Sequence, residues 1–266
     1  MTTTAVILAA GRGRRMGSDL PKVLHQLDGR PLVVHSIERA RGAGADEVVV
    51  VTGYRRELVE EALADAGVRF AVQREQRGTG HAVLSAREHL EGVEGDVVVL
   101  YGDMPLLGVD TIRRLITTRR EAGEAAVALT IVAENPPDFG RIIRDQQGRV
   151  REVVEVKDAD PDQLAIKEVN VGAYCFDAAQ LLPALGQLRS DNAQGEYYLT
   201  DVVGILAGAG RPVETVTAAT LEETLGINDL AHLEFASKLG DIRYAESLYD
   251  LIDAVAMAAR RDREQP

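Results

Sequence analysis

VILAAGRGRRMGSDLPKVL, residues 6–24, is the stretch that decides the fold of this chain. It opens with an apolar run without polar alternation, which is typical of a strand buried on both faces of a parallel sheet. A glycine-rich turn, three arginines within four positions and a Pro-Lys pair follow. Glycines let backbone amides approach a ligand closely, and arginines supply charge for an anion. The stretch therefore predicts a phosphate-binding loop after a buried strand.

Apolar strands and helical patterns alternate through the first half of the chain. The predicted strands are Glu47–Thr52, Val68–Val72, Asp96–Tyr101 and Ala125–Val132. The predicted helices are Leu32–Arg41, Arg56–Ala66, Thr79–Leu90 and Val109–Glu121. Strands that alternate with helices indicate βαβ units. We therefore expect an α/β fold with a mostly parallel, Rossmann-like twisted sheet and helices on both of its faces.

The pattern changes after Glu134. Ile142–Arg144 and Val150–Val156 flank a polar turn at residues 146–148, which predicts a mixed β hairpin insertion. The elements predicted after it are strand Glu168–Phe176, helices Asp177–Leu185 and Tyr197–Ala207, strand Pro212–Val216 and a helix from Leu221 onward. We expect the functional cleft at the carboxyl ends of the strands, where ligands bind in open α/β sheets.

The strand-helix pattern covers only part of the chain. Residues 1–226 carry it and are predicted to form one domain. Residues 227–266 have apolar positions at helical spacing and an arginine-rich end, which predicts a helical C-terminal tail packed on that domain. The alternative is that this tail forms the contact surface of a homo-oligomer.

Composition excludes several classes of protein. The 266 residues are 45% hydrophobic, and the longest apolar runs are far shorter than a membrane span, so no membrane partner is expected. A net charge of −12 argues against a nucleic-acid partner. The single cysteine, Cys175, suits a buried side chain and a reducing, cytoplasmic location. The N-terminal residues do not show the pattern of a signal peptide.

The glycine loop departs from two common phosphate-binding motifs. A P-loop requires a Gly-Lys-Ser/Thr triplet after its spacer, and none follows Gly11. A dinucleotide-binding fingerprint requires a third glycine three residues after Gly13, but Met16 stands there and Gly17 comes one place late. What remains is an anion-binding loop of another type, or a structural turn with surface arginines.

Residues 8–24 resemble a third pattern. Leu8-Ala9-Ala10-Gly11-x-Gly13-x-Arg15-Met16 followed by Leu20-Pro21-Lys22-Val23-Leu24 is similar to the signature of sugar-1-phosphate nucleotidyltransferases. Further motifs of that family follow in order: QREQRGTG (73–80), LYGDMP (100–105), FGRI (139–142), VEVKDA (154–159), EVNVGAY (168–174), NAQGEYYLTD (192–201) and GIND (226–229). Together they resemble the uridylyltransferase domain of the bacterial N-acetylglucosamine-1-phosphate uridylyltransferases, over residues 3–235.

The resemblance implies an activity and a metal. Its members transfer a nucleotidyl group to a sugar 1-phosphate, which here implies UTP and N-acetylglucosamine 1-phosphate as substrates and Mg²⁺ as cofactor. Arg15 is expected on the leaving pyrophosphate and Lys22 on the α-phosphate, because such catalysis depends on positioning and charge neutralisation. Asp103 directly follows a buried strand, where a carboxylate suits Mg²⁺, and the resemblance adds Asn228 as its partner.

The resemblance also implies two sets of binding residues. The nucleotide set is Leu8, Ala9, Ala10, Gly11, Gly13, Gln73, Gly78 and Thr79. The sugar set is Tyr101, Gly102, Gly140, Glu155, Asn170 and Asn228. Gln73 can both donate and accept a hydrogen bond, which suits the imide edge of a base. Glu196, Tyr198 and Thr200 are weaker candidates, for which core packing or helix capping is the alternative.

Some features of the chain leave other interpretations open. Arg14 stands where the family usually has threonine. No hexapeptide period follows the matching region, so the β-helix that performs acetyl transfer in many relatives is not expected. The five histidines lack metal-ligand spacing. The alternatives are a related nucleotidyltransferase for another sugar or base, and a non-catalytic nucleotide-sugar sensor, although a sensor would not need both Asp103 and Asn228.

Overall fold

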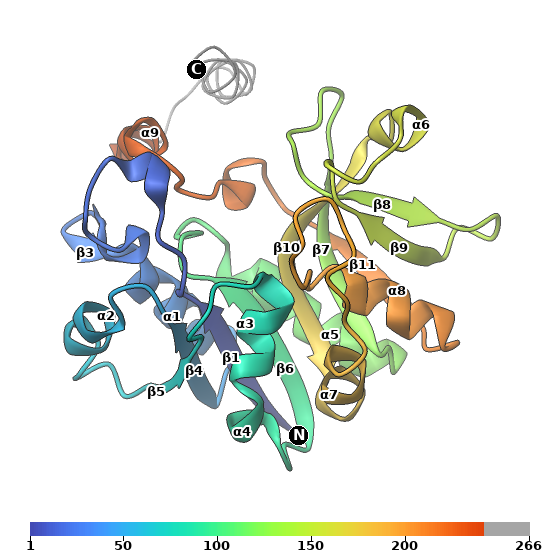
Figure 1. The fold of residues 1–266 in the computed structure, drawn as a ribbon, viewed down its shortest axis with the longest axis horizontal. Coiled ribbons are helices and arrows are strands. Elements are labelled where there is room, and N and C mark those ends of the chain that lie inside the picture. Colours follow the sequence, from blue (N-terminus) through green and yellow to red (C-terminus); the bar gives the residue numbers. More distant parts are fainter. Residues whose placement is uncertain (242–266) are drawn as a thin grey trace.

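A computed structural model describes residues 1–241 of the chain. Within this range the main sheet has the strand order β11-β7-β10-β6-β1-β4-β5, and the β8–β9 hairpin joins it at β10 (Figure 1). The strands are β1 (Thr2–Leu8), β4 (Glu47–Thr52), β5 (Arg69–Val72), β6 (Gly95–Tyr101), β7 (Ala126–Val132), β8 (Arg141–Arg144), β9 (Val150–Val154), β10 (Glu168–Asp177) and β11 (Val213–Thr217). A separate short hairpin pairs β2 (Gln26–Leu27) with β3 (Arg30–Pro31).

β1 lies in the middle of the sheet and leads into the glycine loop. It pairs in parallel with β4 on one side and β6 on the other, so that Leu8 is in register with both Val51 and Tyr101. β5 continues the parallel arrangement beyond β4. On the other side, β10 runs antiparallel to β6 and β7, and β11 is parallel to β7. The carboxyl ends of β1, β4, β5 and β6 therefore meet at one edge.

Helices cover both faces of the sheet (Figure 1). They are α1 (Leu32–Gly42), α2 (Arg56–Ala62), α3 (Thr79–Ser85), α4 (Arg87–Leu90), α5 (Val109–Ala122), α6 (Pro161–Leu164), α7 (Ala178–Leu185), α8 (Asp201–Gly208) and α9 (Leu230–Asp241). On β1, Ile7 belongs to a core with α1, α2 and α5, whereas Val6 belongs to a core with α3, α4, α7 and α8. Successive strand residues point to opposite faces, so an apolar run fills both cores. The predicted α/β architecture is confirmed.

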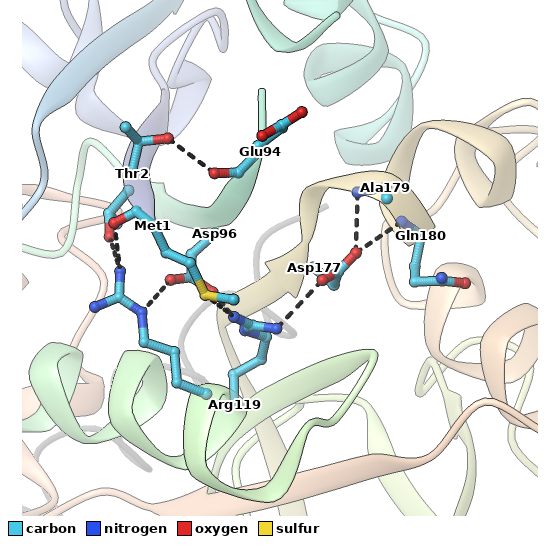
Figure 2. A network of polar contacts seen from close by, with 10 residues as sticks. Met1, Thr2, Glu94, Asp96, Arg119, Asp177, Ala179 and Gln180 are labelled. Atoms are coloured by element: carbon cyan, nitrogen blue, oxygen red, sulfur yellow. Dashed lines mark hydrogen bonds and ion pairs between the residues drawn. The ribbon is translucent and has the colours of Figure 1, made fainter. Parts of the chain in front are cut away.

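A buried ion-pair network holds the edge opposite the glycine loop (Figure 2). Asp96, near the start of β6, is fully buried and pairs with Arg119 and Arg120 of α5, and Arg120 Nε lies 2.5 Å from Asp96 Oδ2. Arg119 also donates to Asp177 at 3.2 Å, and Asp177 in turn accepts backbone amides at the start of α7. These bonds tie two helices to the amino-terminal end of the central strands.

Two smaller predictions are also confirmed. β8 and β9 pair antiparallel around the polar turn, as the predicted hairpin requires, although β9 ends at Val154 rather than Val156. Cys175 is fully buried in β10, and burial raises the pKa of its thiol. A thiol in that environment acts as a small apolar side chain.

Two predicted helices have different bounds in the structure. The helix predicted over Arg56–Ala66 ends at Ala62, because the next residues make tighter i→i+3 backbone bonds. The helix predicted over Thr79–Leu90 divides at Ala86 into α3 and α4. Hydrophobic spacing does not distinguish one helix from two short ones, so these bounds depend on local backbone bonding.

The segment before α8 is not helical where the sequence predicts a helix. The sequence predicts a helix from Tyr197, but α8 begins at Asp201. Tyr197 N donates to Arg77 O and Tyr197 O accepts from Gly80 N, both at 2.8 Å. A backbone group that makes these bonds is not available for helical ones. Tertiary pairing with the start of α3 therefore overrides the local helical pattern.

The sequence patterns also missed the β2–β3 hairpin and helix α6. The β2–β3 hairpin turns at Asp28 and Gly29, whose φ angles of 51° and 74° lie in the left-handed region. An Asp-Gly pair is a strong signal for such a two-residue turn. α6 begins at a capping box in which Asp160 and Gln163 satisfy each other's backbone amides.

The chain after β11 is helical only in part. A 3₁₀ turn at Glu222–Thr224 is followed by non-helical residues 225–229, so the continuous helix predicted from Leu221 is wrong there. α9 then packs Ala236 into a small core with Leu27 and other residues. The predicted tail beyond residue 241 lies outside the described residues. Among residues 1–241, no helix is both long and apolar enough to cross a membrane.

Candidate active site

The loops that follow the parallel strands are joined at the carboxyl edge of the sheet. Gly102 N donates to Leu8 O at 3.0 Å, and Tyr54 N donates to Ala10 O at 3.1 Å. A cavity of about 260 Å³ opens between these loops and the start of α3. The cavity lies where the sequence predicts the functional cleft, because parallel strands expose their loops at a common edge.

This cavity gathers most of the residues that were singled out from the sequence. All of the predicted nucleotide-binding residues except Gly13 line it: Leu8, Ala9, Ala10, Gly11, Gln73, Gly78 and Thr79. Lys22, Tyr101 and Asp103 line it as well. These positions lie up to 95 residues apart in the chain, and the parallel sheet brings them together.

Part of the cavity lining was not predicted from the sequence. Val23, Gln76 and Ala82 also contribute to the cavity wall. Gln76 Nε2 donates to Gln73 O at 3.2 Å, which holds the residues after β5 in a compact turn. Gln73 and Gln76 both belong to the QREQRGTG motif. Membership in that motif is the feature of the sequence from which Gln76 could have been predicted as a lining residue.

Lys22, Asp103 and Asn228 meet at the cavity. The Lys22 ammonium pairs with Asp103 Oδ2 and lies 3.0 Å from Asn228 Oδ1. Two oxygens from distant segments thus converge on one cation. Ile227 N donates to Asp103 O at 2.8 Å, which fixes the segment that carries Asn228 against the end of β6.

Gly13 explains how Lys22 reaches this position. Gly13 has a φ of +65°, and a Cβ there would overlap Lys22 Cβ and lie 3.2 Å from Lys22 Cγ. Glycine adopts this left-handed conformation without strain and leaves room for the lysine stem. Lys22 itself begins a 3₁₀ turn whose next residues, Val23 and Leu24, are buried. Gly13 therefore acts on the site through Lys22.

The arginines of the glycine loop lie at the surface of the site. Met16 is buried and anchors the loop, while Arg14 and Arg15 beside it are exposed. Arg12 lies over the ring of Tyr54, with its guanidinium carbon 5.3 Å from the ring centroid. The lining residues of the cavity do not include these arginines. These three arginines belong to the loop that leads from Ala10 and Gly11, which line the cavity, to Lys22.

Three of the six predicted sugar-binding residues, Gly140, Glu155 and Asn170, form a second group. Asn170 N donates to Gly140 O at 2.8 Å, and a Cβ on Gly140 would lie 3.6 Å from Glu155 Cδ. None of these three lines the cavity described above. Gly102 lies at the end of β6, where a Cβ would come within 3.2 Å of Leu8 O. The structure thus separates Gly140, Glu155 and Asn170 from the nucleotide set, whereas Tyr101 lines the nucleotide cavity and Asn228 contacts Lys22.

Tyr101 connects the two groups. Its ring lines the cavity, and it packs on Gly172, where a Cβ would come within 2.8 Å of the ring. Gly172 has a φ of +98° and lies in an irregular stretch of β10 between Asn170 and Tyr174. A bulged strand often redirects side chains beside a functional site.

The weaker candidates take different positions. Glu196 lines the nucleotide cavity. Thr200 Oγ1 donates to Glu155 Oε1 at 3.0 Å, which places Thr200 in the second group. Tyr198 is buried, with 6% of its surface exposed. Thr200 does not cap α8 with its side chain, so helix capping is not its role.

Burial raises several pKa values around the second group. Burial raises the pKa of the Glu155 carboxyl, and the hydrogen bond from Thr200 opposes that change. The pKa of Tyr101 is raised well above its ordinary value by burial, with the charges of Glu155 and Asp103 adding to it. Burial and neighbouring carboxylates raise the pKa of Asp201 to about 6. This part of the site is acidic and poorly solvated.

Similar proteins cover nearly the whole chain. The bifunctional protein GlmU of Trichlorobacter lovleyi is 45% identical over 238 residues, which make up 89% of this chain and 52% of that protein. The bifunctional protein GlmU of Corynebacterium glutamicum is 46% identical over 238 residues, with 87% of this chain and 49% of that protein covered. The chain thus spans about half the length of the curated relatives that it matches.

The fold has a solved counterpart. The crystal structure of UDP-glucose pyrophosphorylase complexed with UDP-glucose superposes with a TM-score of 0.73 and 17% sequence identity, covering 92% of this chain and all of the other. At that identity the likeness concerns the fold. The family of MobA-like NTP transferase domains matches residues 5–203, which include the glycine loop, Lys22 and Asp103. Together with the geometry of the cavity, this match shows that the chain belongs to the MobA-like NTP transferase domain family.

Proposed function

We propose that this chain transfers a uridylyl group from UTP to N-acetylglucosamine 1-phosphate. A phosphate oxygen of the sugar phosphate attacks the α-phosphorus of UTP and forms a new P–O bond. The bond between the α-phosphorus and the bridging oxygen breaks, and pyrophosphate leaves with its electron pair. The similarity to bifunctional GlmU proteins, the likeness to a UDP-sugar complex and the ordered sequence motifs all support this proposal.

The convergence of Lys22, Asp103 and Asn228 carries the proposal. Nucleotidyl transfer concentrates negative charge on the α-phosphate, and catalysis consists mostly of positioning and charge neutralisation. The Lys22 ammonium stands at the wall of the cavity that the nucleotide set lines, where it can contact that phosphate. Arg15, at the exposed end of the same loop, is proposed to bind the leaving pyrophosphate.

Asp103 and Asn228 suit a divalent cation. Their side-chain oxygens both contact one cation in the structure, the Lys22 ammonium, so they already define a point that attracts positive charge. Mg²⁺ prefers oxygen ligands and usually takes few of them from the protein. We propose that these two residues hold Mg²⁺, which when bound neutralises phosphate charge.

The second group suits the sugar. Asn170 Oδ1 is buried and accepts no hydrogen bond from the described part of the chain. A buried acceptor without a donor is costly, and a sugar hydroxyl or N-acetyl amide would satisfy it. Glu155 and the backbone at Gly140 add further polar groups nearby. We propose that Tyr101 and Gly102 lie between this subsite and the phosphates.

Pyrophosphate release tests the proposal directly. The purified chain is mixed with Mg²⁺, each nucleoside triphosphate in turn, and glucose-, glucosamine- or N-acetylglucosamine 1-phosphate. Release confined to UTP with N-acetylglucosamine 1-phosphate is the expected result. Release with another pair would reassign the substrates within the nucleotidyltransferases. Nucleotide binding without release from any pair would refute the enzymatic proposal and favour a nucleotide-sugar sensor.

Three further proposals concern the context of the chain. We keep the prediction that residues 1–226 form the catalytic domain and that residues 227–266 form a tail packed on it. Contact between two copies through that tail is a proposal that light scattering with and without residues 242–266 would test. A cytoplasmic location likewise remains a prediction from the single cysteine.

A further inference from the structure

The side-chain amide of Gln73 is held in one orientation. Gln73 follows β5, lines the nucleotide cavity and is only 3% exposed. Its Nε2 lies 3.0 Å from Gly78 O and 3.1 Å from His81 Nδ1. Both contacts are made by Nε2. Together they determine that Oε1 is the atom of the amide that remains for a ligand.

The chemistry of these contacts fixes the direction of the amide. Gly78 O is a carbonyl and can only accept, so the atom facing it must be the amide nitrogen. The opposite orientation would place the Gln73 oxygen against that carbonyl. The nitrogen has two hydrogens, of which one goes to Gly78 O and the other to His81 Nδ1. His81 must then have a lone pair on Nδ1 and its proton on Nε2.

A rigid framework holds both partners of the amide. Gly78 has a φ of +109°, and a Cβ there would lie 2.5 Å from Tyr197 O. Gly80 N donates to that same oxygen at 2.8 Å. The ring of His81, in the first turn of α3, faces the Tyr197 ring with centroids 6.2 Å apart. Gly78 and the His81 ring are therefore both packed against the non-helical segment at Tyr197.

We infer that His81 is a positioning residue that sets which pyrimidine the cavity accepts. Because His81 and Gly78 use both amide hydrogens, Gln73 offers only Oε1 to a base. A ring with N3–H, as in uracil or thymine, can donate to Oε1, whereas cytosine has a lone pair at N3. This inference rests on the proposed function, in which the cavity holds the base of a nucleoside triphosphate. It assigns to His81 a role in specificity without contact to the base.

The test compares UTP and CTP in steady-state pyrophosphate release. His81→Leu keeps a side chain of similar size and removes the acceptor, while His81→Asn supplies an oxygen near the position of Nδ1. We expect the UTP-to-CTP ratio of kcat/KM to fall about tenfold in His81→Leu, the scale of one hydrogen bond. The change should lie in KM, because a base contact is made equally in ground and transition states. His81→Asn should restore the ratio.

A matched control separates this role from a general loss of histidine. His89 lies in α4, and its Nε2 contacts Phe70 O at 3.0 Å, outside the cavity. His89→Leu is expected to keep the wild-type ratio. An unchanged ratio in His81→Leu, or an equal fall in His89→Leu, would overturn the inference.

A measurement on the wild-type protein keeps the inference testable if His81→Leu does not fold. Long-range ¹H–¹⁵N correlation reports which imidazole nitrogen carries the proton, and the His81 signals are those missing from His81→Asn. We expect Nε2–H with a bare Nδ1; an Nδ1–H tautomer would contradict the inference. If none of the nucleoside triphosphates gives pyrophosphate release with the wild-type protein, the proposed function fails. The tautomer of His81 is still measurable in that case and tests the inference separately.

Discussion

Replacement of Gly13 by alanine should disable Lys22 without touching its charge. An alanine Cβ at this position would overlap Lys22 Cβ and lie 3.2 Å from Lys22 Cγ and 3.3 Å from its Cα. Contacts with the stem and the backbone of Lys22 cannot be relieved by rotation of the ammonium alone. We expect the lysine to move away from Asp103 and Asn228.

Two costs of this substitution can be separated. The φ of +65° imposes roughly 1–2 kcal/mol of strain on any residue with a Cβ. Displacement of Lys22 removes one electrostatic stabiliser, which costs about 10²-fold in turnover, or about 2.7 kcal/mol. The first cost appears in stability, whereas the second appears in turnover.

Gly17 provides the matched control. Its φ is +62°, and a Cβ there would meet no atom within 4 Å. Gly17→Ala therefore carries the backbone strain without the collision. We expect Gly17→Ala to keep turnover within about threefold, which is less than 1 kcal/mol, while urea unfolding of Gly17→Ala reports the backbone strain alone and Gly13→Ala loses at least as much stability.

Pyrophosphate release with UTP and N-acetylglucosamine 1-phosphate is the assay, with urea unfolding as the check on stability. A double variant, Gly13→Ala with Lys22→Ala, should be no slower than Lys22→Ala alone, because both changes remove the same interaction. Normal turnover in Gly13→Ala would refute the reasoning. So would an equal loss in Gly17→Ala, which would point to loop strain instead of Lys22.

Three further predictions follow from the same structure. Lys22→Ala and Asp103→Ala should each lower turnover by about 10²-fold or more; near-normal pyrophosphate release in either would contradict the proposed role. Asp96→Ala removes the carboxylate that pairs with the buried Arg119 and the more exposed Arg120, and it should cost about 3–5 kcal/mol in urea unfolding because the Arg119 charge stays buried. Arg87→Ala, at an exposed ion pair, should cost less than about 1 kcal/mol. The folded-state pKa of Asp201 is raised to about 6, so ionisation of its carboxyl destabilises the fold progressively as the pH rises from about 4, the ordinary pKa of an aspartate, to about 6, and fully above that; Asp201→Asn should raise the Tm at pH 8, and this gain should shrink at pH 5. A gain independent of pH would show that the charge is not its cause.

Several residues of the candidate site could be located from the sequence. The glycine loop follows an apolar run, and Asp103 follows another, so both were expected at the carboxyl edge of a parallel sheet. The strand register explains why this prediction succeeds. Leu8 and Tyr101 lie side by side at the ends of β1 and β6, so the loops that follow them start at the same edge of the sheet. Asn228 could not be located from a local sequence pattern. It was predicted only because the GIND motif at residues 226–229 resembles a motif of the family.

Other features depend on contacts that no local pattern encodes. Tyr197 stands in a stretch with helical spacing, yet its backbone pairs with Arg77 and Gly80, about 120 positions earlier in the chain. His81 was set aside because the histidines lack metal-ligand spacing, and its contact with Gln73 appears only once α3 is placed beside the end of β5. The separation of Gly140, Glu155 and Asn170 from the nucleotide set likewise follows from the tertiary structure, in which Tyr101 lines the cavity and packs on Gly172 of β10.

The sequence by itself determined the layered α/β architecture, the buried strands and the glycine loop at the end of β1. These depend on hydrophobic periodicity and on glycine's freedom of φ, which act over a few residues. The tertiary structure alone decided that Lys22 meets Asn228, 206 positions away, and that His81 orients Gln73. The physical reason is that a side-chain hydrogen bond needs two groups within about 3 Å in the right direction, and the packing of whole elements sets that distance.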